Sequence, residues 1–285
     1  MGMNASNKIA TFFKYFVLIL VGIIMIYPLL WMISATFKDN SEIFAGISLW
    51  IKNPTLDGYK NALNNFGGSI NILQAMLNTY SYVIPKVICT VVSACVAAYG
   101  FGRFDFPGRK LLFNIMLATL FLPQVVLNVP QYLLYNKFGW LDSPFYLAIW
   151  VHCAFATETY FVYQLVQFMR NVPRDLDEAA MLDGCSKPGI LFKIMIPIVK
   201  PAIVTAAIFA FYWIWQDFFQ PLIFVSSPKN YTIPLALKLY TDPNSYNNYG
   251  GLFAMSVLSL LPVIIVFILF QKYIVEGIAT DGIKG

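Results

Sequence analysis

Three charged side chains lie within strongly apolar stretches of this 285-residue chain: Lys86, Glu158 and Asp217. A charged group at the middle of a bilayer costs about 2.5 to 3.5 kcal/mol on insertion scales, so these groups should face protein or a water-filled path. Carboxylates and amides accept hydrogen bonds from solute hydroxyls, and indole rings offer flat apolar faces for stacking. The residues predicted to line such a solute path are Trp213, Trp215, Asp217, Glu158 and Asn78.

Structural roles compete with this interpretation. Asp217 could accept a hydrogen bond between helices or from a partner subunit, while Glu158 and Lys86 could pair with each other or lie near an interface. The tryptophans could belong to the packing core or to an interfacial aromatic belt. His152 precedes Glu158 by six residues, which would place the two well apart around a continuous helix, so we expect no proton relay between them.

Catalytic and metal-binding motifs are missing from the sequence. The chain has one histidine, no Gly-x-Ser-x-Gly elbow, no aspartate-rich metal motif and no Gly-Lys pair of a phosphate-binding loop. Four cysteines have no paired metal spacing and are expected to be small buried residues without a disulfide: Cys89, Cys95, Cys153 and Cys185. We therefore expect a non-catalytic chain with no metal and no cofactor of its own.

The elements that carry these residues are predicted to be membrane-spanning helices. Hydrophobic residues make up 59% of the chain, charged residues 12%, and the mean hydropathy is +0.66. A bilayer core about 30 Å thick needs roughly 20 apolar residues of helix. Six segments meet this requirement, which predicts an all-α membrane protein with six transmembrane helices: 16–34, 76–101, 111–129, 144–168, 201–225 and 252–270.

The distribution of lysine and arginine predicts the orientation. With the N-terminus inside, twelve of them fall in cytoplasmic connections and six outside, so both termini should be cytoplasmic. The net charge of +5 is spread through short connections, which argues against nucleic-acid binding. The first segment has no small-residue cleavage site and is interpreted as an uncleaved anchor. The predicted extracellular loops are 35–75, 130–143 and 226–251, and we expect the two longer ones to have no core of their own.

The cytoplasmic loop 171–200 contains "EAAMLDGCSKPGILFKIMIP", residues 178–197. Acidic residues after Pro173 predict a short helix to about Asp183, since they suit the positive end of a helix dipole. Gly184 permits the left-handed conformation that ends a helix, and Ser186 with Pro188 can start the next. The pattern predicts a helix, a turn and an amphipathic helix that ends at Pro197. A hairpin that only connects two spans is the simpler alternative.

This loop resembles the signature loop of the ATP-binding-cassette importer permeases. The shared pattern is Glu-Ala-Ala, three residues, a glycine, nine residues, then Ile-x-Ile-Pro, with Ile196 and Cys185 as mild departures. Further segments resemble the carbohydrate branch of that superfamily, specifically its maltose-permease-like smaller subunit: "NTYSYV", "AAYGFGRFDFPGR", "WIWQDFFQPLIF" and "GIATDGIKG". The resemblance covers nearly the whole chain and implies the type I importer fold.

The resemblance also implies partners. They are a second homologous permease forming a heterodimer, two cytoplasmic ATPase subunits that use ATP-Mg, and an extracellular sugar-binding protein that lands on the outer loops. For "EIFAGISLWI" in the first outer loop, covering the lipid surface is the alternative. In this family the paired cytoplasmic helices dock into a cleft on the ATPase, and the C-terminal tail reaches toward the ATPase dimer. The residues implied for coupling are Glu178, Ala179, Ala180, Met181, Asp183 and Gly184, and those implied for the tail contact are Gly282, Lys284 and Gly285.

The resemblance therefore implies a permease subunit in an ATP-driven sugar importer of the prokaryotic plasma (inner) membrane, with oligosaccharides as the expected substrates. Three alternatives stay open at this point. The solute could be a non-sugar such as glycerol phosphate, the chain could be an ion-coupled secondary transporter, or it could be a sensor built on the permease scaffold. A secondary transporter would not need the folded Glu-Ala-Ala loop.

Overall fold

The computed structural model describes residues 5–64, 70–240 and 248–282. Helices connected by turns and loops make up this part of the chain, and no β-strand occurs in it, which confirms the all-α prediction. The chain divides into two compact units. Unit 1 combines Met1–Leu73 with Ala236–Leu260, and unit 2 combines Gln74–Leu235 with Leu261–Gly285.

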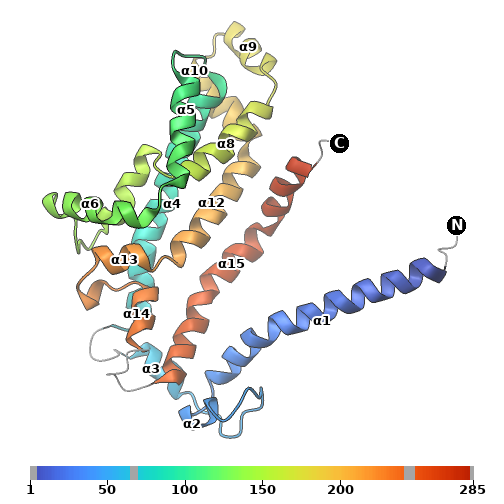
Figure 1. Ribbon diagram of the computed structural model, residues 1–285, viewed down its shortest axis with the longest axis vertical. Coiled ribbons are helices and arrows are strands. Elements are labelled where there is room, and N and C mark those ends of the chain that lie inside the picture. The colour runs from blue at the N-terminus through green and yellow to red at the C-terminus, as the bar shows by residue number, and fades with distance from the viewer. Residues whose placement is uncertain (1–4, 65–69, 241–247, 283–285) are drawn as a thin grey trace. The chain divides into compact units, whose positions relative to one another are not determined.

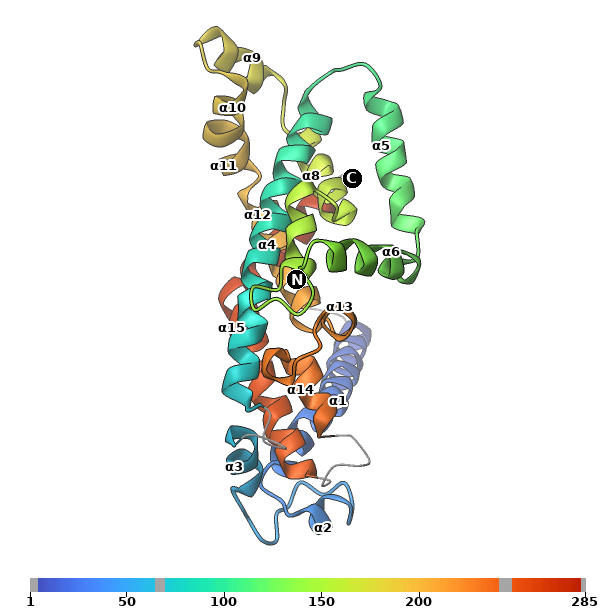
Figure 2. The ribbon, with the colours of Figure 1, turned by 90° about the vertical axis from the view of Figure 1, so that its left-hand side faces the viewer.

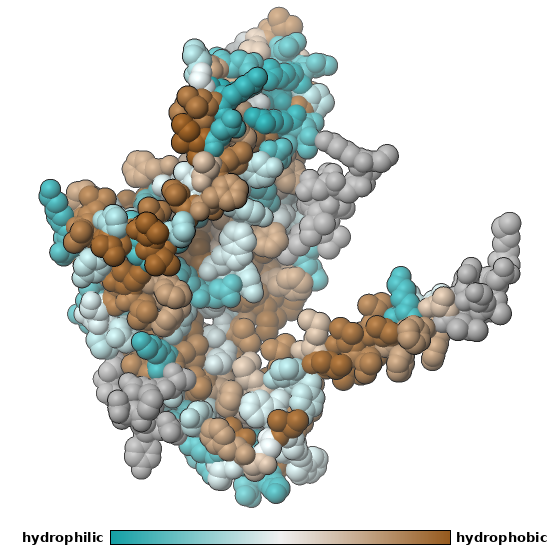
Figure 3. Space-filling model, in the orientation of Figure 1, coloured by the Kyte–Doolittle hydropathy of each residue, from teal (hydrophilic) through white to brown (hydrophobic). Residues whose placement is uncertain are grey.

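Unit 1 is built around α1 (Ala5–Ala35), the short helices α2 (Asn40–Ile43) and α3 (Asp57–Leu63), and the first part of α15 (Tyr249–Gly282). From Ala10 to Ala35, α1 has a mean hydropathy of 2.7, and its most apolar stretch buries no residue within the chain. The hydrophobic cover of this helix is visible in Figure 3. Such a helix requires lipid or another protein around it, as the anchor prediction states.

The outer loop 35–75 packs more tightly than expected. Thr36 and Ala62 are fully buried, and the buried Lys38 ammonium donates to the carbonyl oxygen of Ser48. A Cβ added to Gly58 would lie 2.7 Å from the carbonyl oxygen of Gly250, so only glycine permits this approach of two backbones. The prediction that the long outer loops lack a core is therefore wrong. Its basis was the polar composition of the loops, which does not register contacts between distant segments.

In unit 2, α4 (Ile72–Arg103), α8 (Thr159–Asn171) and α12 (Lys200–Trp215) lie side by side (Figures 1 and 2). Small side chains permit close packing here, because Ala94, Ala98 and Ala206 are completely buried. The other helices of this unit are α5 (Arg109–Ala118), α6 (Gln124–Lys137), α7 (Leu147–Trp150), α9 (Asp175–Leu182), α10 (Lys187–Ile190), α11 (Ile196–Ile198), α13 (Phe219–Phe224) and α14 (Ile233–Leu239), which ends in unit 1.

Three of the six predicted segments are single helices long and apolar enough to cross a membrane: α1, α4 and α15. The third predicted segment is divided between α5 and α6, which meet at an angle of 99°. Pro123 precedes α6 in an extended conformation, with a ψ of 124°, and because proline has no N–H to donate, it favours a break at this position. The chain also bends by 78° between Lys187–Ile198 and Lys200–Trp215, at the start of the fifth segment. Counting each bent pair as one span gives five.

The fourth predicted segment, 144–168, contains no continuous helix. It consists of α7, a 3-10 turn at Val151–Phe155 and the start of α8. Ala156 lies between the last two with a φ of +56°, which is the left-handed region. Average hydropathy does not register such a break, because the polar residues Thr157, Glu158 and Thr159 after it are averaged with the apolar residues around them.

Asp142 connects the outer loops 130–143 and 226–251 within unit 2. Its carboxylate accepts hydrogen bonds from the backbone N–H groups of Ser226 and Ser227, from the Ser227 hydroxyl and from the Asn230 amide. Partial burial pushes the pKa of Asp142 upward, but the hydrogen bonds from Ser227, Asn230 and Ser226 outweigh it and hold the pKa below its usual value. The loops are therefore connected by a charged acceptor.

Candidate functional site

The predicted helix-turn-helix is present at one end of unit 2 (Figure 2). We define the coupling hairpin as residues 173–198, which include α9, α10, a π-helical turn at Leu191–Met195 and α11. Gly184, at a φ of +77°, donates to the carbonyl oxygen of Met181, and Cys185 donates to that of Ala180. This is the Schellman ending that a glycine in the left-handed conformation makes possible. The Ser186 hydroxyl accepts from the N–H of Gly189 and caps the second helix.

Most of the predicted coupling residues are exposed on α9 and the turn after it. Glu178, Ala179, Met181, Asp183 and Gly184 are exposed, whereas Ala180 is only 7% exposed and belongs to the interior of the hairpin. Hydrophilic side chains gather over this end of unit 2 (Figure 3). The tail residue Gly282 is the last residue of α15, while Lys284 and Gly285 lie outside the described residues.

Leu182 is a surface residue that the sequence reasoning missed. Its apolar side chain is 89% exposed at the end of α9, and Met181 beside it is 49% exposed. Exposed apolar side chains that adjoin one another can form part of a contact surface for another protein. The signal in the sequence was the pair Met181-Leu182 on an otherwise acidic helix.

Arg103, the last residue of α4, holds the coupling hairpin to the helices of unit 2. Its side chain is 2% exposed, and its Nε lies 2.7 Å from a carboxylate oxygen of Asp177 on α9. The other guanidinium nitrogens donate to the carbonyl oxygens of Met169, Val172 and Pro173. Arg103 therefore caps the C-terminal end of α8, where a cation is favourable, and pairs with α9 at the same time.

The second helix of the hairpin is also attached to α4. The Tyr99 hydroxyl donates to the carbonyl oxygen of Lys187 over 3.0 Å, and the Lys187 ammonium lies 5.0 Å from the centre of the Phe104 ring. A cavity of about 250 Å³ lies between these groups. Both hairpin helices therefore contact the same end of α4, a helix long enough to span a membrane.

A polar cavity of about 200 Å³ brings together three of the five residues predicted for the solute path: Glu158, Trp213 and Asp217. Trp213 comes from α12, and Glu158 immediately precedes α8. The rest of the lining consists of Lys86, Thr90, Gln124, Phe161, Ala210, Ile214 and Gln220. Seven side chains with polar atoms converge here, as a polyhydroxylated solute requires.

Lys86 does not form the predicted ion pair with Glu158. Its side chain is buried, and the ammonium donates to the Gln220 side-chain oxygen over 2.6 Å. The N–H of Gln220 in turn donates to the Asp217 carboxylate over 3.2 Å. Within the part of the chain that the structure describes, no ion pair joins Lys86 to Glu158, although both side chains line the same cavity.

Asn78 and Trp215 do not line this cavity. The Asn78 amide donates to the carbonyl oxygens of Lys229 and Tyr231 and accepts from Gln74, so its hydrogen-bonding capacity is used within the protein. Trp215 is 5% exposed and packs against the Tyr80 ring. A solute role for these two residues stays a prediction without a contact to support it.

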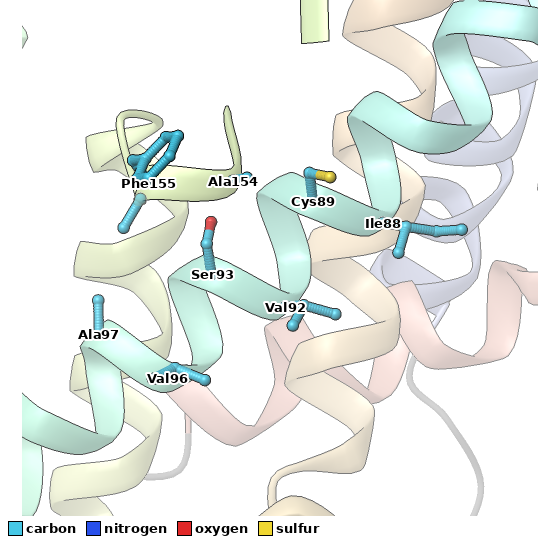
Figure 4. Close-up of a pocket in the computed structure, with 9 residues that line it drawn as sticks. Ile88, Cys89, Val92, Ser93, Val96, Ala97, Ala154 and Phe155 are labelled. Carbon is cyan, nitrogen blue, oxygen red and sulfur yellow. The ribbon is translucent and has the colours of Figure 1, made fainter. Parts of the chain in front are cut away.

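A second hollow, of about 470 Å³, lies between α4 and the segment 154–156. Figure 4 shows Ile88, Val92 and Val96 along it, with the Ser93 hydroxyl pointing toward the segment that contains Ala154 and Phe155. The Ser93 hydroxyl donates to the carbonyl oxygen of Cys153 over 2.7 Å. The remaining side chains of this groove are nearly all apolar, so it suits a lipid chain better than a sugar.

The fold and the hairpin define an all-helical membrane protein of the importer-permease class, a multi-pass protein of the prokaryotic plasma membrane. Residues 94–280 match the family of binding-protein-dependent transport system inner membrane components, and the chain belongs to this family. The resemblance seen in the sequence is thereby confirmed.

Several related proteins are named as permeases of sugar transport systems. The chain is 30% identical to the trehalose/maltose transport system permease protein MalG of Thermococcus litoralis, covering 94% of each chain. It is 30% identical to the arabinooligosaccharides transport system permease protein AraQ of Bacillus subtilis, covering 93% of each. It is 29% identical to the diacetylchitobiose uptake system permease protein NgcG of Streptomyces coelicolor, covering 96% of this chain and 89% of that protein.

A solved structure shares the fold. It is the crystal structure of a bacterial ABC transporter that imports the acidic polysaccharide alginate, with a TM-score of 0.79 and 22% sequence identity. The match covers 96% of this chain and 99% of the chain in that structure. At this identity the likeness establishes the fold alone.

Proposed function

We propose that this chain forms one half of the translocation pathway of a sugar importer and couples it to ATP hydrolysis in separate subunits. The sugar assignment is supported by the names of the three relatives above and by the polar cavity. The proposed substrate class is an oligosaccharide, in line with the names of two of these relatives. The chain would itself be non-catalytic and bind no nucleotide, with ATP-Mg used by two cytoplasmic ATPase partners.

The observation that carries the coupling proposal is the double attachment of the hairpin to α4. Asp177 of α9 pairs with Arg103, and the backbone of Lys187 at the start of α10 accepts from Tyr99. In this mechanism an ATPase grips the exposed face of α9 through Glu178 and Leu182. Closure of the ATPase dimer then displaces the hairpin, and the displacement reaches the solute path through α4, which also carries Lys86.

The polar cavity supplies the solute contacts in this mechanism. Glu158 and Asp217 would accept hydrogen bonds from sugar hydroxyls, and Trp213, which is 43% exposed, would present its ring to a sugar face. A second, homologous permease would complete the path, and an extracellular sugar-binding protein would deliver the solute to the outer loops.

Reconstitution of the importer in proteoliposomes tests the proposal. Leu182→Arg and Glu178→Lys change exposed side chains and should leave insertion intact, while the amount of ATPase that co-purifies falls at least tenfold and uptake is lost. Lys110→Glu is the matched control, since it reverses an exposed charge on α5 and should change neither measurement. Ala180 is unsuitable for this test because a bulky side chain at its buried position would disrupt the hairpin itself.

Two results would contradict the proposal. Normal uptake with both hairpin variants would show that the ATPase does not dock there. Uptake that depends on an ion gradient and persists without any ATPase would assign the chain to the secondary transporters instead. Replacing the sugar-loaded binding protein by one loaded with glycerol phosphate separates the two substrate classes.

A further inference from the structure

The break in the fourth apolar segment brings together three side chains that bind transition metals. In a continuous helix, His152 and Glu158 would point in different directions. Here the 3-10 turn ends at Phe155, and Ala156 adopts the left-handed conformation. Donor atoms of His152, Cys153 and Glu158 consequently lie within 4.8 Å of one another. The prediction that His152 and Glu158 lie well apart is therefore wrong, because it assumed a helix that is not there.

The spacing of these donors suits a tetrahedral ion. The Cys153 sulfur lies 3.6 Å from a carboxylate oxygen of Glu158. A thiolate about 2.3 Å and a carboxylate oxygen about 2.1 Å from a tetrahedral zinc ion are separated by about 3.6 Å. The observed distance therefore needs no rearrangement of this pair, and the imidazole has to approach by an ångström or so at most.

The imidazole of His152 has a nitrogen to offer. Its Nδ1 is buried and has no hydrogen-bond partner among the described residues. Buried polar atoms without a partner are uncommon in proteins and call for an explanation such as an ion. The ring is held in place by the Tyr135 ring, which stacks on it with the centroids 6.3 Å apart.

The surroundings orient the ligands and balance the charge. The carbonyl oxygens of His152 and Cys153 accept from the hydroxyls of Thr157 and Ser93, so the backbone on the turn is fixed. Glu158 shares its cavity with Asp217 and Lys86. A Cys153 thiolate, two carboxylates and one ammonium sum to a charge of −2, which a divalent cation neutralises.

We propose that His152, Cys153 and Glu158 bind a zinc ion, with the fourth coordination position directed into the polar cavity that Glu158 lines. Binding releases the thiol proton of Cys153 to solvent and forms one sulfur, one nitrogen and one oxygen bond to the ion. The ion bridges residues on both sides of Ala156. The ion thereby stabilises the left-handed conformation of Ala156, which is unfavourable for a residue with a Cβ.

Zinc and cobalt binding to the purified full-length chain test this site without any measurement of transport. After dialysis against micromolar zinc, one zinc per chain is expected by elemental analysis. X-ray absorption at the zinc edge should show one sulfur at about 2.3 Å and nitrogen or oxygen at about 2.0 to 2.1 Å. Cobalt in place of zinc should give the near-ultraviolet charge-transfer band of a cobalt–thiolate bond.

Variants of two of the three ligands make the test specific. Cys153→Ser and His152→Ala should each weaken zinc binding at least a hundredfold, and Cys153→Ser should abolish the cobalt–thiolate band. Cys95→Ser is the matched control, because Cys95 is also a buried free cysteine but lies on α4 outside the cluster. Equal zinc content in the ligand variants and the wild type, or no sulfur in the zinc shell, would overturn the proposal and leave the 3.6 Å contact as a thiol–carboxylate hydrogen bond.

Discussion

Replacing Arg103 by methionine should detach α9 of the coupling hairpin from α4 without changing the surface that is proposed to meet an ATPase. The substitution leaves the Asp177 carboxylate without its cation and removes the donors to the carbonyl oxygens of Met169, Val172 and Pro173. Methionine keeps an unbranched apolar side chain in the position. Any weakening of the attachment therefore reports on the lost polar contacts of the guanidinium and not on a cavity left by a smaller side chain.

The size of the effect follows from the burial of the pair. Breaking a buried ion pair by removing one partner costs about 3 to 5 kcal/mol. The Asp177 side chain is 15% exposed and can turn partly to water, so the lower end of about 3 kcal/mol applies. Since about 1.4 kcal/mol corresponds to a factor of ten, the population of the detached hairpin should rise roughly 150-fold.

Arg109→Met is the matched control. Arg109 also pairs with an aspartate near the hairpin, at 2.6 Å, but the Asp105 side chain is 68% exposed. Exposed pairs contribute about 0 to 1 kcal/mol, so this variant should raise the detached population by no more than about fivefold. Any general effect of losing an arginine at this end of unit 2 is removed by the comparison.

Limited trypsin digestion after Arg174 measures the detached population, because the Arg174 carbonyl oxygen accepts from the N–H groups of Asp177 and Glu178 in the first turn of α9. Cleavage requires this turn to open, and it follows the open form when opening is fast. In the assembled importer, Arg103→Met should still retain the ATPase, yet the stimulation of ATP hydrolysis by the loaded binding protein should be lost. Adding Asp177→Leu to Arg103→Met should restore part of the protection, since no unpaired carboxylate remains. Equal digestion rates for Arg103→Met and Arg109→Met would refute the reasoning.

Two further predictions concern the outer loops. Asp142→Asn should lower the thermal stability at neutral pH. Because the folded pKa of Asp142 lies below its usual value of about 3.9, the difference in stability from the wild type should hold above about pH 5 and shrink as the pH falls through that lowered pKa. A difference in stability that is unchanged down to about pH 3 would contradict this prediction. Gly58→Ala should lower the free energy of unfolding by about 1 to 3 kcal/mol in denaturant, because its Cβ would meet the Gly250 backbone. The control Gly100→Ala, in the open part of α4, should be neutral or slightly stabilising. Equal stability of the two variants would show that the backbones of Gly58 and Gly250 do not approach each other.

The coupling hairpin could be predicted from sequence because its determinants are local. Acidic residues in the first turn, Gly184 at the end of α9 and Ser186 before the next helix each act within a few residues of the chain. Each also requires one conformation for a physical reason, so the helix, the turn and the following helix appear where they were expected. The bend of 78° before α12 was signalled only by the prolines on both sides of it.

The attachment of the hairpin could not be predicted in the same way. Arg103 and Asp177 are 74 residues apart, and nothing in the pattern around either residue selects the other. Arg103 stands in a segment that contributed to the family resemblance, yet its side chain was read only as one of the cytoplasmic positive charges. A buried guanidinium that caps one helix and pairs with another is visible only once the helices have been placed.

The candidate sites lie at helix breaks that hydropathy does not predict. Hydropathy finds the third, fourth and fifth segments because it sums apolar residues, but it treats each as one straight helix. Both the polar cavity and the cluster of His152, Cys153 and Glu158 occur where that assumption fails, at Pro123, at Ala156 and after Trp215. A break frees backbone groups and redirects side chains, and in lipid it persists only where protein or water satisfies those groups. Interruptions inside apolar segments of this family are therefore the positions at which polar chemistry should be sought first.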